Sequence, residues 1–141
     1  MNERPLPDVD DPDFEPYFRG CAGGELRIPH CAVCGWWQWP PRSICPRCQS
    51  NAWTWDKAPQ TATLYSWTTI WRPGLPGFVS EVPFAVVVVE LDAIPNVRML
   101  SSSVDCRPED LSIGLRMETV FRQCADNVSL PYWRPVQSKA H

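Results

Sequence analysis

The pattern of apolar and polar residues from Thr61 onward predicts a β structure. Thr61–Trp71 is rich in threonine, tryptophan and β-branched residues, and Phe84–Leu91 is a continuous apolar run of strand length. Asn96–Ser103 predicts a third strand. Leu115–Arg122 alternates apolar and polar side chains, as a half-buried strand does, and VSLPYW, which begins at Val128, completes a set of five candidate strands.

The connections between these strands narrow the choice of fold. The prolines and glycines of Arg72–Pro83 prevent regular structure, so this segment is expected to be a long exposed loop of the kind that often carries function. Pro108 and Glu109 favour a single helical turn. Short strands in this arrangement match a small Greek-key barrel of the OB type, and an open sandwich is the alternative.

The N-terminal part changes character after an acidic, proline-containing stretch. Residues 1–12 are expected to form an extended arm, whereas residues 13–22 predict a short helix that ends at Gly23 and Gly24. Pro16 suits the first turn of this helix. Its apolar side consists of Phe14, Tyr17, Phe18 and Cys21. The helix covers either the protein's own core or a partner.

Between the helix and the predicted barrel lie two CxxC pairs, separated by ten residues. The pairs are Cys31 with Cys34 and Cys45 with Cys48. Two such turns facing each other complete a tetrahedral zinc site, and four thiolates close the coordination shell against water, which suits a structural role. A thiol redox couple and unmetallated core cysteines are the competing interpretations.

Local residues support the two turns. Gly35 permits the positive φ angle with which such a turn often ends, and Pro46 stiffens the second turn. Pro40 and Pro41 predict a chain reversal between two short ribbon strands, and Trp53–Trp55 predicts a strand that leaves the metal site.

Length and composition limit the remaining possibilities. A chain of 141 residues suits one domain, or a small domain with an appendage, and has enough residues for a real core. An odd total of seven cysteines, four of them committed by spacing, favours a reducing compartment. No apolar run approaches the roughly 20 residues that cross a bilayer, so a cytoplasmic protein is expected, with no membrane partner.

Four segments together resemble a known family. They are CAVCGWWQWPPRSICPRC, VPFAVVVVEL, PEDLSIGLRMETVF and LPYWRP, in this order after an aromatic helix. The family is bacterial and archaeal, was long catalogued as a domain of unknown function, and pairs a rubredoxin-like zinc ribbon with an OB-fold. The resemblance runs from about Asp13 to Val136.

The resemblance implies a mainly β protein with a short N-terminal helix, a rubredoxin-like zinc ribbon and a five-stranded OB-fold barrel. The expected segments are an arm over 1–12, a helix and lead-in over 13–28, the ribbon over 29–56, the OB-fold over 57–137 and a tail over 138–141. It also implies structural zinc on Cys31, Cys34, Cys45 and Cys48, a thiolase-like partner in a hetero-oligomer, and acyl-CoA as the ligand of the complex.

The residues give little support to a catalytic role for this chain alone. It has only two histidines, His30 beside the first turn and His141 at the terminus, and no serine or cysteine has an evident base nearby in sequence. We expect His30 to be a neighbour of the metal site or a surface residue. Cys106 and Cys124 are expected to be buried small side chains.

The aromatic and basic residues suggest contacts instead. The residues expected to meet the partner or acyl-CoA are Trp36, Trp37, Arg42, Trp71, Arg72 and Phe78. The predicted function is a non-catalytic accessory subunit of a thiolase-fold enzyme that cleaves acyl-CoA esters by retro-aldol chemistry, as in steroid side-chain degradation.

Three alternatives stay open at this point: a subunit of a CoA-dependent thiolase in aromatic degradation, a single-stranded nucleic-acid binder, and an independent acyl-CoA hydrolase. The net charge of −3 argues against nucleic acid as a partner, because an OB-fold that binds it needs a basic groove.

Overall fold

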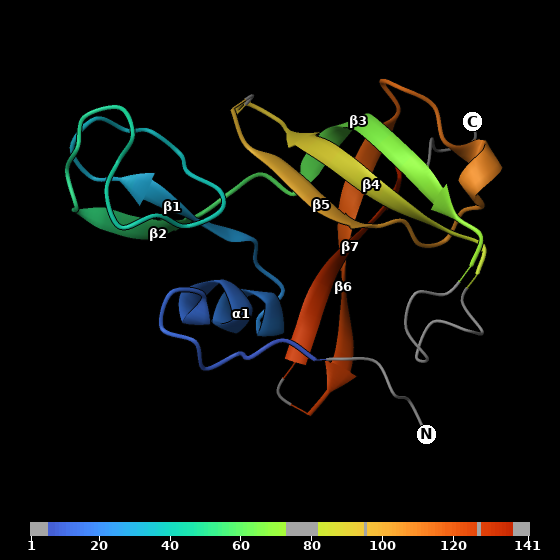
Figure 1. Ribbon diagram of the computed structural model, residues 1–141, viewed down its shortest axis with the longest axis horizontal. Coiled ribbons are helices and arrows are strands. Elements are labelled where there is room, and N and C mark those ends of the chain that lie inside the picture. Colours follow the sequence, from blue (N-terminus) through green and yellow to red (C-terminus); the bar gives the residue numbers. More distant parts are fainter. Residues whose placement is uncertain (1–5, 73–81, 95, 127, 137–141) are drawn as a thin grey trace, which may run out of the picture.

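The computed structural model describes residues 6–72, 82–94, 96–126 and 128–136. Its elements are α1 (Glu15–Ala22), β1 (Arg27–Cys31), β2 (Trp53–Lys57), β3 (Thr61–Ile70), β4 (Phe84–Leu91), β5 (Arg98–Ser102), the 3₁₀ helix η2 (Pro108–Asp110), β6 (Arg116–Ala125) and β7 (Val128–Pro135). A two-stranded ribbon, β1–β2, occupies one end of the molecule, and the larger sheet occupies the other (Figure 1).

The larger sheet closes into a barrel. Its strand order is β5–β4–β3–β6–β7, and the neighbours in this order pair antiparallel. The two outer strands meet through a parallel bridge between Ser103 and Trp133, where the N–H of Val104 donates to the Trp133 carbonyl at 2.8 Å. Five strands closed in this way form an OB-type barrel, which confirms the predicted fold over the open sandwich.

Strand β4 places apolar side chains on both the inner and the outer face of the barrel. Its side chains alternate between buried and half-buried positions along the whole strand. Val87 and Val89 point into the barrel and are fully buried, whereas Val86 and Val88 lie on the outer face and are half-buried. The continuous run therefore reflects an inner core face and an apolar outer face.

Tryptophans supply much of the core. Trp133 lies inside it with 1% of its surface exposed. Half-buried indoles that pack against the same core are Trp37, Trp39, Trp55 and Trp67. Most of the eight tryptophans of the chain therefore contribute to packing.

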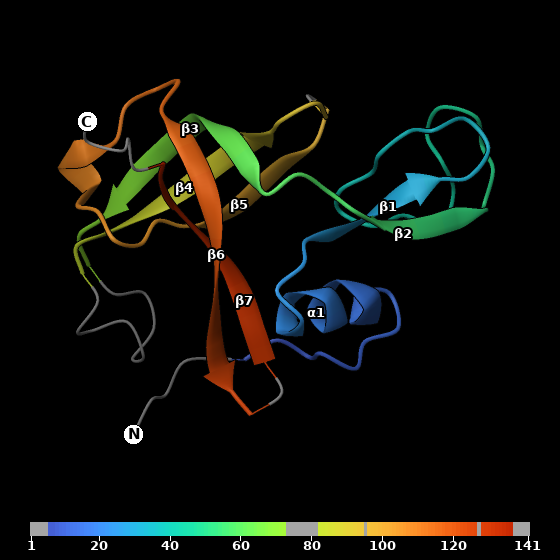
Figure 2. The same ribbon diagram turned by 180° about the vertical axis from the view of Figure 1, so that it is seen from behind.

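Helix α1 covers the protein's own core. It packs against β7 and β1, as both views show (Figures 1 and 2). Tyr17 and Cys21 are buried on its inner side, and the Tyr17 ring lies 4.6 Å from the ring of Trp39. Burial raises the pKa of the Cys21 thiol to about 12, so this thiol stays protonated. Among the described residues, no helix is long and apolar enough to cross a membrane.

An ion pair links the end of β4 to the start of β6, and a hydrogen bond joins the start of β3 to it. Arg116 Nη1 donates to Asp92 Oδ1 at 2.8 Å, and the Thr61 hydroxyl donates to Asp92 Oδ2. The Arg116 hydrogen bond, followed by that of Thr61, lowers the pKa of Asp92 to about 2. The arginine is therefore held in a fixed position and is unavailable to an external anion.

Candidate metal centre

The four cysteines sit on two turns of the same kind. In the first turn the N–H of Gly35 donates to the Cys31 carbonyl at 3.0 Å, and in the second the N–H of Gln49 donates to the Cys45 carbonyl at 2.8 Å. The first cysteine of each pair is buried, and the second is exposed. Each turn therefore presents its two sulfur atoms toward the other turn.

The sulfur positions fit a tetrahedral metal ion. All four Sγ atoms lie within 4.8 Å of one another. The Cys31 and Cys48 sulfurs are 3.5 Å apart, and those of Cys34 and Cys45 are 3.6 Å apart. A zinc ion with Zn–S bonds of about 2.3 Å places its ligands about 3.8 Å apart, which agrees with these separations. The described residues therefore suit a closed zinc site, as predicted.

Neighbouring groups shift the pKa values of Cys31 and Cys48 in opposite directions. The N–H of Cys34 lowers the pKa of Cys31 to about 6. Although the Ser50 N–H acts in the opposite direction, burial and the adjacent sulfurs raise the pKa of Cys48 to about 12. Some thiols thus ionise readily while another keeps its proton. A bound cation neutralises the accumulating charge and allows all four to ligate as thiolates.

The two ribbon strands lie outside the cysteine turns, one before the first turn and one after the second. β1 and β2 pair antiparallel from Arg27 opposite Lys57 to Cys31 opposite Trp53, so they flank the two turns. Pro40 and Pro41 lie between β1 and β2 as predicted, but within a long connection that also contains both cysteine turns. The sequence alone did not reveal Arg27–Cys31 as a strand.

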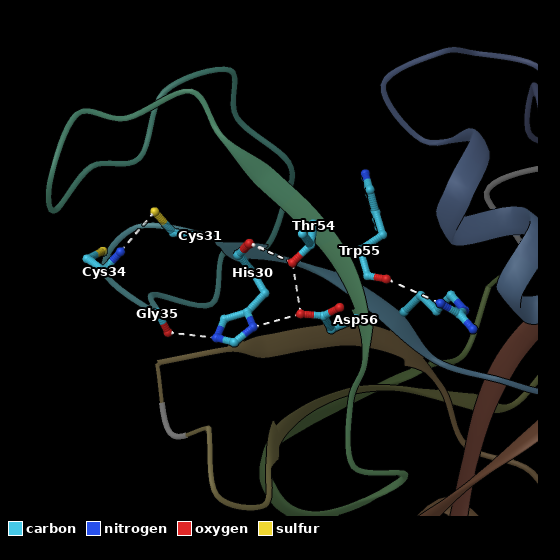
Figure 3. Close-up of polar contacts among 8 residues, drawn as sticks. His30, Cys31, Cys34, Gly35, Thr54, Trp55 and Asp56 are labelled. Atoms are coloured by element: carbon cyan, nitrogen blue, oxygen red, sulfur yellow. Dashed lines mark hydrogen bonds and ion pairs between the residues drawn. The ribbon is translucent and has the colours of Figure 1, made fainter.

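His30 precedes the first cysteine turn and lies outside the four-cysteine cluster. Its Nδ1 lies 2.8 Å from Asp56 Oδ2 and its Nε2 lies 3.1 Å from the Gly35 carbonyl oxygen (Figure 3). The hydrogen bonds from His30 and Thr54 lower the pKa of the Asp56 carboxyl. Both ring nitrogens of His30 are therefore engaged, and the ring braces the first turn against β2.

Gly35 and Gln49 each follow the second cysteine of a CxxC pair, so substitutions at these two positions can be compared. Gly35 has φ +81° and Gln49 has φ +65°, so both occupy the left-handed region that favours glycine. We expect Gly35→Ala to destabilise the zinc-loaded protein by about 1 kcal/mol, and Gln49→Gly to stabilise it by a few tenths of a kcal/mol. Thermal denaturation in the presence of zinc measures both.

Steric clash does not explain the expected loss, since the nearest atom to an added Cβ at Gly35 is His30 Nε2, 3.9 Å away. Equal melting temperatures for wild type and Gly35→Ala would show that backbone strain at this turn is unimportant.

The predicted contact residues of the ribbon have different surroundings. Trp37 is half-buried, with its ring stacked on His30 at a centroid distance of 4.0 Å. Trp36 is also half-buried, and its Nε1 donates to Gln38 Oε1 at 3.0 Å. Arg42 is exposed. Of these three residues only Arg42 is fully on the accessible surface, whereas Trp36 and Trp37 are partly covered and Trp37 packs against the core.

The predicted contact residues of the barrel follow β3. Trp71 is 71% exposed, and Arg72 beside it is exposed. Phe78 lies outside the described residues. The structure therefore places Trp71 and Arg72 on the barrel and Trp36, Trp37 and Arg42 on the ribbon, in two different parts of the molecule.

The isolated cysteines Cys106 and Cys124 differ from the prediction in their burial. Cys106 and Cys124 are half-buried, which is less buried than expected. Burial raises the pKa of Cys106, and the Cys124 sulfur lies 3.8 Å from the Tyr132 hydroxyl. A raised pKa disfavours the reactive thiolate, so Cys106 lacks the character of a nucleophile.

Several exposed residues around the metal turns were not predicted from the sequence. Val33 lies within the first CxxC, Arg47 lies within the second, and Ile44 immediately precedes the second. All three are exposed. The sulfur atoms of each CxxC turn face inward, so the residues between or beside the cysteines point outward. This feature of the sequence could have predicted that the three residues are exposed.

A four-thiolate zinc ribbon joined to an OB barrel defines the class of this protein. Residues 18–54 match the family described as "ChsH2, rubredoxin-like zinc ribbon domain", and residues 55–122 match "ChsH2, C-terminal OB-fold domain". The chain belongs to this family, known as ChsH2 or DUF35, which confirms the resemblance seen in the sequence.

Three relatives illustrate the range of the family. DUF35 domain-containing scaffold proteins of Methanothermobacter thermautotrophicus and Methanocaldococcus jannaschii are 33% and 29% identical, over 66% and 69% of this chain and 68% and 67% of theirs. A probable enoyl-CoA hydratase alpha subunit of Thermomonospora curvata is 30% identical over 94% of this chain. The chain spans only 40% of the length of that third relative.

Two solved structures agree with the fold. A chain of the Ltp2-ChsH2(DUF35) aldolase superimposes with a TM-score of 0.81 at 29% identity, covering 94% of this chain and 98% of that chain. A DUF35-family protein of Sulfolobus solfataricus has a TM-score of 0.59 at 14% identity, covering 92% and 89% of the two chains, and supports the fold alone.

Proposed function

We propose that this chain is a non-catalytic accessory subunit of a thiolase-fold enzyme that cleaves a carbon–carbon bond of an acyl-CoA ester by retro-aldol chemistry. The observation that carries the proposal is the near-complete superposition on a chain of the Ltp2-ChsH2(DUF35) aldolase. The word aldolase in that protein's name favours retro-aldol cleavage over the thiolytic alternative.

The character of the site supports an accessory role. A four-thiolate shell leaves no open position for a substrate, so the metal would hold the ribbon in shape. Both ring nitrogens of His30 are occupied by Asp56 and Gly35, and His141 lies outside the described residues. The groups that move protons in the reaction would belong to the partner.

The hydratase activity named for the Thermomonospora curvata relative is not part of the proposal. That protein is much longer than the segment matched here, which covers 40% of it. In our proposal the chain supplies a docking surface and part of the acyl-CoA contact. The candidates are Trp36, Trp37, Arg42, Trp71, Arg72 and Phe78.

Reconstitution with a thiolase-fold protein from the same organism tests the proposal. In the retro-aldol reaction of a β-hydroxyacyl-CoA, the Cα–Cβ bond breaks, the hydroxyl group loses its proton and becomes a carbonyl, and Cα gains a proton. The products are a ketone or aldehyde and a shorter acyl-CoA, without a second thiol. We expect the co-purified complex to form both products without added CoA, and this chain alone to form neither.

The controls separate the alternatives. A requirement for free CoA and a β-ketoacyl-CoA substrate would indicate a thiolase complex instead. Turnover by the isolated chain, or failure to form a complex detectable by size-exclusion chromatography with light scattering, would contradict the proposal. Trp71→Ala and Arg72→Ala are expected to weaken the complex or its apparent affinity for acyl-CoA, whereas Ile113→Ala, at a side chain 66% exposed, is a matched control.

A further inference from the structure

The metal turns display apolar side chains to solvent. Val33 is 67% exposed and Ile44 is 55% exposed. They directly precede Cys34 and Cys45, whose sulfur atoms are 3.6 Å apart, so the two apolar residues extend from neighbouring points of the ribbon. Neighbouring exposed apolar side chains rimmed by polar residues mark interaction sites, whereas singly scattered ones do not.

Arginines lie next to these apolar residues. Arg42 and Arg47 flank Ile44 in the sequence and are exposed. The guanidinium carbon of Arg47 lies 5.8 Å from the ring centroid of Trp36, which connects the second turn to this indole. We call Val33, Trp36, Arg42, Ile44 and Arg47 the ribbon tip.

The ribbon tip carries two guanidinium groups beside a four-cysteine site whose net charge with four thiolates and zinc would be −2. Residues 26–55 contain three arginines and no aspartate or glutamate. In the part of the chain that the structure describes, neither Arg42 nor Arg47 has an ion-pair partner. Apart from Arg72, the other described arginines are all ion-paired: Arg19, Arg27, Arg98, Arg107, Arg116, Arg122 and Arg134. The ribbon tip therefore holds guanidinium groups available to an external anionic group.

The ribbon tip is also fixed in shape before any partner arrives. Each turn is closed by its own backbone hydrogen bond, and the N–H of Cys45 donates to the Ser50 carbonyl at 2.8 Å. A metal ion on the four clustered sulfur atoms would add a clamp at the centre. A surface that is already ordered loses little conformational entropy on binding, which favours affinity.

We propose that the ribbon tip docks on an acidic protein surface with an apolar centre, which receives Val33 and Ile44 while its carboxylates pair with Arg42 and Arg47. This inference rests on the proposed function, because the thiolase-fold partner is the protein expected to carry that surface. Arginine and tryptophan are the residue types that contribute most at the centres of protein interfaces.

Two other interpretations of the surface are less well supported. A nucleic acid would meet only a few free cations here, and two unpaired arginines do not form a basic groove. The outer face of the barrel is apolar around Leu100, which is 70% exposed, but the nearby Arg98 is paired with Glu90. Around Leu100 the barrel therefore offers apolar area without an unpaired arginine beside it.

The test measures binding of the thiolase-fold partner to immobilised wild-type chain and to the double variants Val33→Ser/Ile44→Ser and Arg42→Glu/Arg47→Glu. We expect each double variant to bind about tenfold more weakly or worse. Wild-type affinity should fall between about 50 mM and about 500 mM NaCl, and this salt dependence should largely disappear in the arginine variant. Unchanged zinc content verifies that the variants fold.

Matched controls make the result specific. Ile113→Ser and Arg19→Glu change exposed residues elsewhere and should leave binding unaltered. Wild-type affinity in both ribbon-tip variants would overturn this inference alone. It would also be overturned if only Leu100→Ser weakened binding, or if a single-stranded oligonucleotide bound and required Arg42 and Arg47. Absence of any wild-type complex would overturn the proposed function together with this inference.

Discussion

Replacing Cys45 with serine is expected to remove zinc from the protein and to unfold the ribbon turns. Cys45 is fully buried, and its sulfur is 3.6 Å from that of Cys34. A serine hydroxyl stays protonated at neutral pH and is a poor zinc ligand beside three sulfurs. Because structural zinc sites supply on the order of 10 kcal/mol or more to folding, losing one of four ligands should cost several kcal/mol of that energy.

Zinc content and proteolysis measure this effect together. The wild type should hold about one zinc ion per chain, as a four-thiolate site does, and Cys45→Ser should hold almost none after dialysis. Cys106→Ser is the matched control, because it removes a thiol outside the site. A Cys45→Ser protein with full zinc content and wild-type resistance to proteolysis would contradict a structural four-cysteine site.

The damage should be limited to the ribbon turns. Leu26 and Ile28 are fully buried in the core shared with the barrel, so apolar packing holds β1 at its first residues. Beyond His30 the turns depend on backbone hydrogen bonds and the metal. Amide hydrogen exchange after zinc removal should therefore accelerate in residues 31–52 more than in the barrel.

Local patterns explain which parts of the fold were predictable. The metal site depends on residues close in sequence, and the CxxC spacing is sufficient to position each pair of sulfurs. Phe84–Leu91 was predicted with the same bounds as β4, because a strongly apolar run of strand length between Pro83 and Asp92 favours a buried strand. The barrel followed from the number and spacing of such segments.

Pairing partners explain the parts that were not predictable. The strand expected to end at Arg122 continues as β6 to Ala125, because its last residues pair with the start of β7 across a register shift. Arg27–Cys31 becomes a strand only because Trp53–Lys57 lies beside it. The residues of one strand do not indicate which other segment will pair with it, so these strands and bounds could not be predicted locally.

The same limit applies to the candidate contact residues. Residue type suggested Trp36, Trp37 and Trp71 equally, yet exposure separates them, since Trp37 stacks on His30 and Trp71 is open to solvent. Sequence also did not distinguish Arg42 from Arg27, which pairs with Glu25 at 2.7 Å. Exposure and ion pairing arise from tertiary contacts, so they required the structure.

Truncating Trp133 to alanine is expected to produce the largest loss of stability in the barrel. Its side chain is 1% exposed, and its backbone carries the parallel bridge that closes the barrel. Removing a buried indole leaves a cavity that rigid strands fill poorly, so the free energy of unfolding should fall by about 3–5 kcal/mol. The melting temperature should fall by about 10–20 °C. Trp133→Phe retains most of the ring and should lose less.

Trp71→Ala, in contrast to Trp133→Ala, is expected to leave the stability of the barrel nearly unchanged. Its indole is 71% exposed, so truncation should change the free energy of unfolding by less than about 0.5 kcal/mol. Comparable destabilisation in Trp71→Ala and Trp133→Ala would mean that Trp71 is a packing residue, and its proposed role in partner contact would lose its basis. An unchanged Trp71→Ala melting temperature combined with weaker partner binding separates contact from packing at a single tryptophan.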